Sequence, residues 1–149
     1  MGKMNAGQVV LCGLLAGAVI FVGEFVLGVA IIARDFEAAL MELGLGPLRF
    51  GPATALLFGA IWLAMGVLAV WLYAAIRPRF GPGPRTAVYA GLFIWTIGVF
   101  FPTVGLVWLE LLPVRLAVIA TAWRLIEVPL ATIAGARVYR EEAGVPAGA

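Results

Sequence analysis

The chain has 149 residues, of which 64% are hydrophobic and 12% are charged, and its formal net charge is +2. An average soluble domain has roughly 45–50% apolar and about 25% charged residues, so a soluble fold could not bury this much apolar surface, and the lipid bilayer must be the solvent. Without any histidine, and with Cys12 as the only cysteine, the chain offers no internal disulfide and none of the usual haem or zinc sites.

The first predicted element is a membrane-spanning helix over residues 8–33. Its apolar stretch is longer than the core of a signal peptide, which has about 7–15 residues, so it is interpreted as a span and not as a removable signal. In residues 34–50, apolar side chains such as Phe36 and Leu40 recur at helical spacing. This spacing predicts a short amphipathic helix on the membrane surface.

The second and third predicted spans cover residues 52–76 and 86–112. Both are long enough to cross a bilayer, which takes about 20 mainly apolar residues. Between them lies the polar segment RPRFGPGPR, residues 77–85, whose glycines and prolines end both helices. Pro102 is expected to kink the third span, because proline removes a backbone N–H and clashes with the preceding turn.

The fourth predicted span covers residues 114–139 and follows the third after a very tight turn at Pro113. The sequence therefore predicts one transmembrane domain over residues 1–149. Its fold class is all-α: a left-handed antiparallel bundle of four transmembrane helices, with the surface helix between the first two. Small residues at near-heptad spacing let membrane helices pack closely and predict the packing seams. The expected packing glycines are Gly17, Gly28, Gly59, Gly66, Gly91, Gly98 and Gly105.

The distribution of arginines predicts the orientation, because lysine and arginine accumulate on the cytoplasmic side. The segment between the second and third spans has Arg77, Arg79 and Arg85 and no acid, and these side chains are expected to contact lipid phosphates. Both termini should then be cytoplasmic, in a multi-pass protein of the inner (plasma) membrane. At the opposite interface, Glu110 is expected to pair with Arg115.

Three charged residues lie within the predicted spans: Glu24 in the first, and Arg124 and Glu127 in the fourth. Glu24 lies roughly 6 Å beyond the middle of a helix that runs outward, and Arg124 roughly 3 Å before the middle of one that runs inward. Their depths are therefore similar, which predicts a cluster of the three inside the bundle. Because two acids face one base, one carboxyl is expected to be protonated.

Two interpretations of this cluster stay open. In the structural one, Arg124 holds the first and fourth helices together and fixes their register. In the functional one, Glu24 or Glu127 carries protons or binds a cationic substrate, since ionisable residues inside a membrane are functional candidates. The structural interpretation is favoured, because no long polar path accompanies the three residues.

The segment WLYAAIRPRFGPGPRTAVYAGLFIW, residues 71–95, and the motif GEFVLG of the first span are similar to small uncharacterised four-helix bacterial membrane proteins. The resemblance implies a four-helix fold and an inner-membrane location, and it assigns no functional residue. Small multidrug transporters also place a glutamate in their first helix. This chain departs from them, since it is longer and inserts residues 34–50.

The favoured function is that of a non-catalytic structural or accessory subunit of a homo-oligomer or a larger membrane complex. The alternative is a small proton-coupled transporter or channel that uses Glu24 and Glu127. A membrane enzyme acting on lipid ranks third, because the chain has no serine or histidine for a nucleophile set. The expected partners are the bilayer and a protein or a second copy, with no nucleic acid, cofactor or metal. An ordered tail at residues 144–149 would favour a partner that holds it.

Overall fold

The computed structural model describes residues 4–47 and 51–140, so Lys3, Arg49 and the tail at residues 144–149 lie outside the described chain. All its regular structure is helical. Four helical segments are long and apolar enough to cross a membrane: Ala6–Ile31, Pro52–Phe80, Pro84–Trp108 and Val114–Val138. These segments agree with the four predicted spans, and the all-α fold class is confirmed. The left-handed sense of the bundle stays a prediction.

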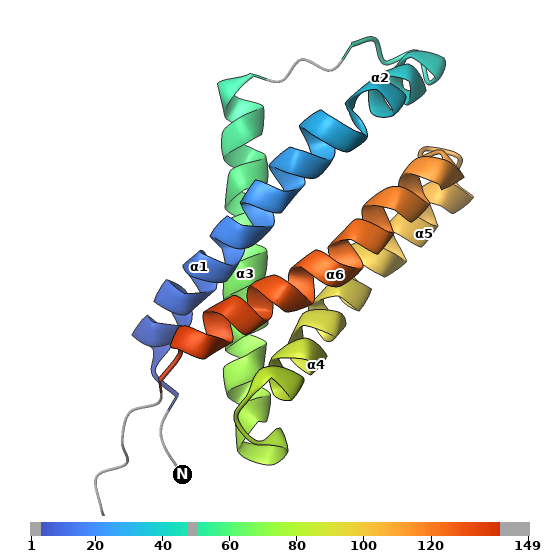
Figure 1. Ribbon diagram of the computed structural model, residues 1–149. Coiled ribbons are helices and arrows are strands. Elements are labelled where there is room, and N and C mark those ends of the chain that lie inside the picture. Colours follow the sequence, from blue (N-terminus) through green and yellow to red (C-terminus); the bar gives the residue numbers. More distant parts are fainter. Residues whose placement is uncertain (1–3, 48–50, 141–149) are drawn as a thin grey trace, which may run out of the picture.

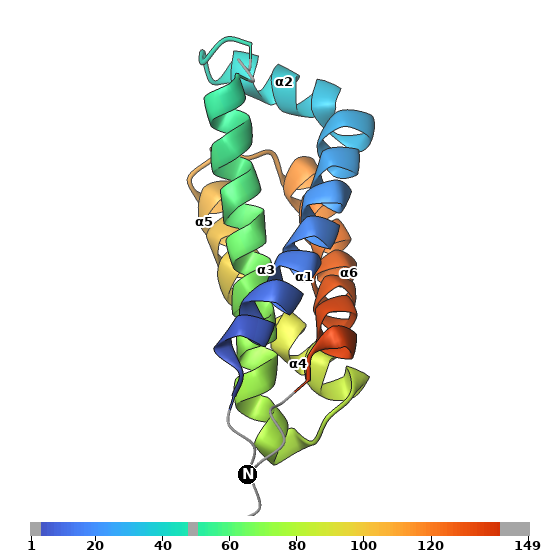
Figure 2. The ribbon, with the colours of Figure 1, turned by 90° about the vertical axis from the view of Figure 1, so that its left-hand side faces the viewer.

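The four spans form a closed bundle in which neighbouring helices pack against one another, and α3 (Pro52–Phe80) and α6 (Val114–Val138) also touch across its centre (Figures 1 and 2). α1 (Ala6–Val26) packs against α3, and α3 packs against α4 (Pro84–Trp95). α4 packs against α6, which returns to α1. The start of α1 and the end of α6 lie at the same end of the bundle (Figure 1).

Local sequence explains where the helices begin and end. The side chain of Asn5 caps α1 by accepting a hydrogen bond from the Gln8 backbone N–H at 3.0 Å. Pro52 and Pro84 lie in the first turns of α3 and α4, where a missing N–H costs nothing. Gly81, at φ 82°, ends α3 in a conformation that side-chain-bearing residues rarely adopt.

The helix predicted between the first two spans is α2 (Ala33–Glu42), which follows the π-helix η1 (Leu27–Ile31). Its position on the membrane surface stays a prediction. α2 is shorter than the predicted segment 34–50, whose last residues, 48–50, lie outside the described chain. In Figure 1, α2 lies at the end of the bundle opposite the N-terminus. Only that end of the bundle contains α2, so the two ends differ in their residues as well as in their structure.

The third span differs from its prediction in two ways. It is interrupted by the π-helix η2 (Thr96–Phe100), after which α5 (Phe101–Trp108) continues. The π-turn directly precedes Pro102, so the irregularity expected at that proline takes the form of wider helical turns. The span also ends at Trp108 and not at residue 112, because Glu110 adopts φ 58° in the turn that leads to Pro113, the N-cap of α6.

Most of the buried core lies in the half of the bundle that contains the chain ends. All buried residues of α3 fall between Gly66 and Ala74, in its second half, and α5 has no buried residue. The core contains mainly small and branched side chains, including Ala16, Ile20 and Val70. Towards α2, the helices have fewer buried residues and more of their side chains are exposed.

The predicted packing glycines fall into two groups. A Cβ added at Gly66 would overlap the backbone of Gly17, and one at Gly91 would come within 2.7 Å of the Pro129 Cα. By contrast, a Cβ at Gly28 or Gly105 would have nothing within 4 Å. A Cβ at Gly59 would meet only the Phe21 side chain, at 3.5 Å, and a Cβ at Gly98 would meet only the Met65 side chain, at 3.4 Å. Of the predicted glycines, close helix approach therefore requires Gly17, Gly66 and Gly91. It also requires Gly13 and Gly135, where an added Cβ would come within 2.5 Å of the Val67 Cα and 2.7 Å of the Cys12 carbonyl oxygen.

A candidate charge cluster between α1 and α6

Glu24 and Arg124 form a bidentate ion pair that joins the last turn of α1 to the middle of α6. Arg124 Nε donates to Glu24 Oε1 at 2.5 Å, and Arg124 Nη2 donates to Glu24 Oε2 at 2.7 Å. The side chains are 10% exposed for Glu24 and 21% exposed for Arg124. Two parallel hydrogen bonds between charged groups fix both the distance between the two side chains and their relative orientation.

A third helix contributes an aromatic ring to the pair. The Arg124 guanidinium carbon lies 5.3 Å from the centroid of the Trp62 ring, and Trp62 belongs to α3. This distance is within the range of a cation–π interaction, which strengthens when water is excluded. Arg124 therefore contacts side chains from α1 and α3 while it is itself part of α6.

Glu127 lies one helical turn after Arg124 and is more deeply buried, at 8% exposure. Its two carboxyl oxygens make no hydrogen bond of regular geometry in the described chain, and the polar groups closest in effect are the Trp123 indole and the Glu24 carboxyl. One of the two oxygens, Oε1, lies directly against Gly23 of α1, in the space that a Cβ at that position would occupy. Gly23 is thus the residue that lets the carboxyl of Glu127 reach the backbone of α1.

The cluster combines one permanent positive charge with two carboxyl groups. The structure brings all three predicted residues to the α1–α6 interface, but Arg124 pairs only with Glu24 among the described residues. No group of three metal-binding side chains occurs in residues 4–47 and 51–140. The chemistry available here is ion pairing and proton binding.

The expected pair between Glu110 and Arg115 is not formed, and this prediction is corrected. Arg115 instead pairs with Asp35 of α2, with Nη1 3.2 Å from Oδ2. Arg115 is in the first turn of α6, close enough to reach across to α2, whereas Glu110 is exposed within the irregular turn before Pro113. The contact joins α2 to the turn between the last two spans.

The three arginines expected at lipid phosphates have different surroundings. Arg77 is half-buried, and its guanidinium lies 5.8 Å from the ring centroid of Tyr139. Arg79 and Arg85, on either side of the polar turn, are both exposed. Contact of any of the three with phosphate stays a prediction.

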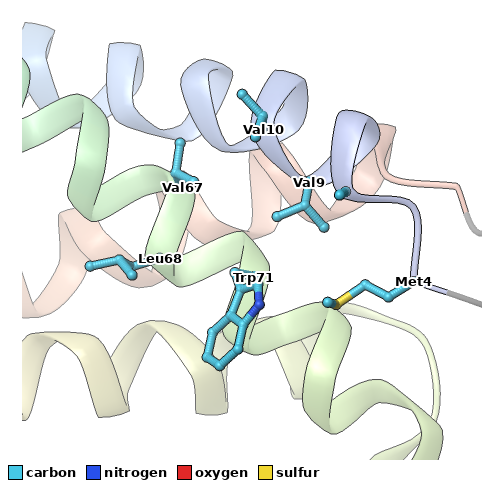
Figure 3. Close-up of a pocket in the computed structure, with 7 residues that line it drawn as sticks. Met4, Val9, Val10, Val67, Leu68 and Trp71 are labelled. Atoms are coloured by element: carbon cyan, nitrogen blue, oxygen red, sulfur yellow. The ribbon is translucent and has the colours of Figure 1, made fainter.

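Two apolar hollows lie on the bundle surface, and neither contains a residue of the charge cluster. The first, of about 350 Å³, lies between the start of α1 and α3 and is lined by side chains such as Val9, Val67 and Trp71 (Figure 3). The second, of about 490 Å³, lies between α5 and α6 and includes Trp108 and Thr121. Both are open at the surface and suit acyl chains or apolar side chains.

These features define an α-helical, multi-pass membrane protein with a compact intramembrane charge cluster. No protein-family description, no curated protein and no solved structure matches the chain. The resemblance to small four-helix bacterial membrane proteins therefore stays a prediction. The function has to be argued from the residues themselves.

Three residues of the site were not anticipated as part of it. Trp62 was not among the predicted site residues, and Gly23 was absent from the predicted packing glycines. The third is Trp123, four residues before Glu127 on α6, whose buried indole N–H acts on the Glu127 carboxyl without forming a hydrogen bond of regular geometry. A usable signal existed for Gly23, because it follows Ile20 by three residues and precedes Leu27 by four, a spacing that puts all three on one face of the helix.

Proposed function

We propose that the protein is a non-catalytic membrane subunit that acts as a structural or accessory component of a homo-oligomer or a larger membrane complex. The bidentate Glu24–Arg124 pair is the observation that carries this proposal. A buried ion pair with fitted geometry specifies which helices pack and in which register. A fixed helix register suits a structural subunit, because it keeps the same helix faces exposed for binding to partners.

The outer surface supports a role in assembly. α5 contributes no buried residue, and the hollow between α5 and α6 leaves aromatic side chains such as Trp108 uncovered. Helix association in membranes depends on close packing, because lipid is as apolar as the side chains. A face with a hollow of this size can accept large side chains of another helix.

The proposal is tested by separating assembly from proton flux in reconstituted vesicles. Glu24→Gln and Arg124→Gln should each reduce assembly, measured by cross-linking and native mass spectrometry. The double variant, in which no charge is left unpaired, should recover much of it, and so should the charge exchange Glu24→Arg with Arg124→Glu. Unchanged assembly in Glu24→Gln, together with loss of proton flux, would overturn the structural role.

The second candidate is a small proton-coupled transporter or channel that uses Glu24 and Glu127. It is favoured by one observation, the burial of the Glu127 carboxyl while the arginine of the cluster is paired with Glu24. Its test is a pH-sensitive dye enclosed in vesicles that contain the protein. A proton leak that disappears in Glu127→Gln, with assembly intact, would support this candidate. No leak above that of empty vesicles would eliminate it.

We place the protein in the inner (plasma) membrane with both termini in the cytoplasm. The arginine-rich turn supports this orientation, since Arg79 and Arg85 are exposed at the end of the bundle that contains the chain ends. The opposite end has α2, with Asp35 and Glu37 in its first half.

A further inference from the structure

We propose that Glu127 and Glu24 share a single proton and that Arg124 selects which of them is ionised. In the conformation described above, Arg124 holds Glu24 as a carboxylate and Glu127 is a carboxylic acid. In the alternative conformation, Arg124 turns to Glu127, and Glu24 takes the proton. The inference deepens the role proposed for the cluster, but it does not require transport.

Charge balance is the first argument. An ion in a low-dielectric interior is tolerated only when it is paired, and an unpaired buried carboxyl becomes neutral by binding a proton. Arg124 supplies one positive charge, and both of its hydrogen bonds to the cluster go to Glu24. Glu127, which is more than nine-tenths buried, has no counter-charge left.

The surroundings of Glu127 offer no other charge. The charged groups that act on it are Glu24, from α1, and Arg124, on its own helix. α3 contributes the neutral ring of Trp62 through its contact with Arg124, and Trp123 of α6 is also neutral. The titratable residues of α4, Arg85 and Tyr89, are exposed. One bound proton therefore makes the whole cluster neutral.

Helix geometry makes the exchange possible. Arg124 and Glu127 are three residues apart on α6, a spacing at which side chains of one helix pair. Arg124 is one-fifth exposed, so its side chain has room to turn. In the exchange, the O–H bond of Glu127 breaks and a proton is released, while Glu24 gains a proton and forms an O–H bond. The cluster has zero net charge before and after.

The exchange would also change the contact between α1 and α6. In the described conformation, two charge-assisted hydrogen bonds cross this interface, and the Glu127 carboxyl lies against Gly23. In the alternative, both charges of the pair lie on α6, and no ion pair joins the helices. Proton binding at the cluster is thereby linked to how firmly α1 is held.

The experiment is infrared difference spectroscopy of the full-length protein in lipid at neutral pH, since a protonated carboxyl has a carbonyl-stretch band that carboxylates lack. The wild type should show one such band, shifted in heavy water, and Glu127→Gln should lose it. Glu24→Gln should lose it as well, because Arg124 is then free to ionise Glu127. Arg124→Gln should gain a second band, and Glu110→Gln, a change at an exposed acid, should alter nothing.

Each outcome has a defined meaning. A wild type without the band overturns the shared proton, and a band that persists in Glu24→Gln overturns the selection by Arg124. If Arg124→Gln does not fold, the two glutamate variants decide the question. Gly23→Ala should shift the band, because the added Cβ displaces the carboxyl, whereas Gly28→Ala should not. Band changes without any vesicle proton flux would eliminate the transporter candidate and leave this inference standing.

Discussion

Gly66 of α3 and Gly17 of α1 meet backbone to backbone, with no room for a side chain between them. The same crossing brings the Gly13 carbonyl oxygen within 2.5 Å of the position of a Cβ at Gly66. Because backbone atoms cannot move aside as the end of a flexible side chain can, this crossing is the part of the bundle most sensitive to added volume.

Gly66→Ala is therefore expected to lower the free energy of unfolding by about 1–3 kcal/mol, the usual cost of overpacking. The measurement is the folded fraction during titration of a mild detergent with a denaturing one. Gly105→Ala is the matched control, since a Cβ there meets nothing within 4 Å and alanine favours a helix over glycine by up to about 1 kcal/mol. Equal losses in the two variants would contradict the close crossing.

Removal of the ring beside Arg124 tests the cation–π contact. Trp62→Leu should reduce the free energy of unfolding by about 1–2 kcal/mol more than Trp71→Leu, because a cation–π contact contributes about 2 kcal/mol when it is desolvated. Trp71 is a suitable control, since it is half-exposed and lines the first hollow, apart from the charge cluster. In Arg124→Gln, the difference between the two tryptophan variants should shrink.

The two ion pairs of the described chain should differ sharply in strength. Arg115 and Asp35 are 77% and 39% exposed, so Asp35→Ala should change stability by less than about 1 kcal/mol, and less still at high salt. Glu24→Gln should cost about 1.5–3 kcal/mol, because it removes the charge-assisted hydrogen bonds between α1 and α6 even when Glu127 becomes the partner of Arg124. Denaturation with and without added salt measures both, and a large, salt-insensitive effect of Asp35→Ala would be unexpected.

The proposed orientation is open to cysteine labelling. Cys12→Ala removes the single natural thiol, a buried small residue whose loss the core should tolerate. In that background, a membrane-impermeant thiol reagent should label Glu37→Cys on intact cells. It should label Arg85→Cys only after the membrane is opened. The reverse pattern would show that the bundle has the opposite orientation.

The spans could be predicted from the sequence because length and hydropathy decide them. The bilayer requires about 20 apolar residues per helix, and that requirement acts on each segment separately. The proximity of Glu24 and Arg124 was also predictable, since two charges of opposite sign at similar depth have few other ways to avoid lipid.

The sequence could not predict side-chain contacts that depend on how distant parts of the chain are placed in the fold. The partner of Arg115 is Asp35 and not Glu110, because the path of the chain from Trp108 to Pro113 and the position of α2 decide which acid is within reach. The role of Gly23 depends on a single contact with Glu127 between distant parts of the chain. Residue spacing along one helix does not predict such contacts between helices. The contact of Arg124 with the Trp62 ring was unpredictable for the same reason.

The π-turn at Thr96–Phe100 has a consequence for insertions and deletions in this protein. A π-turn bonds each N–H to the carbonyl five residues back, so it holds one residue more than an α-turn. Deleting one residue there would restore α geometry and leave the residues of α5 on the faces they now occupy, whereas a deletion in a regular part of the span would rotate everything that follows by about 100°. The π-turn is therefore the place in this span where the chain can lose a residue without changing which side of α5 faces α6.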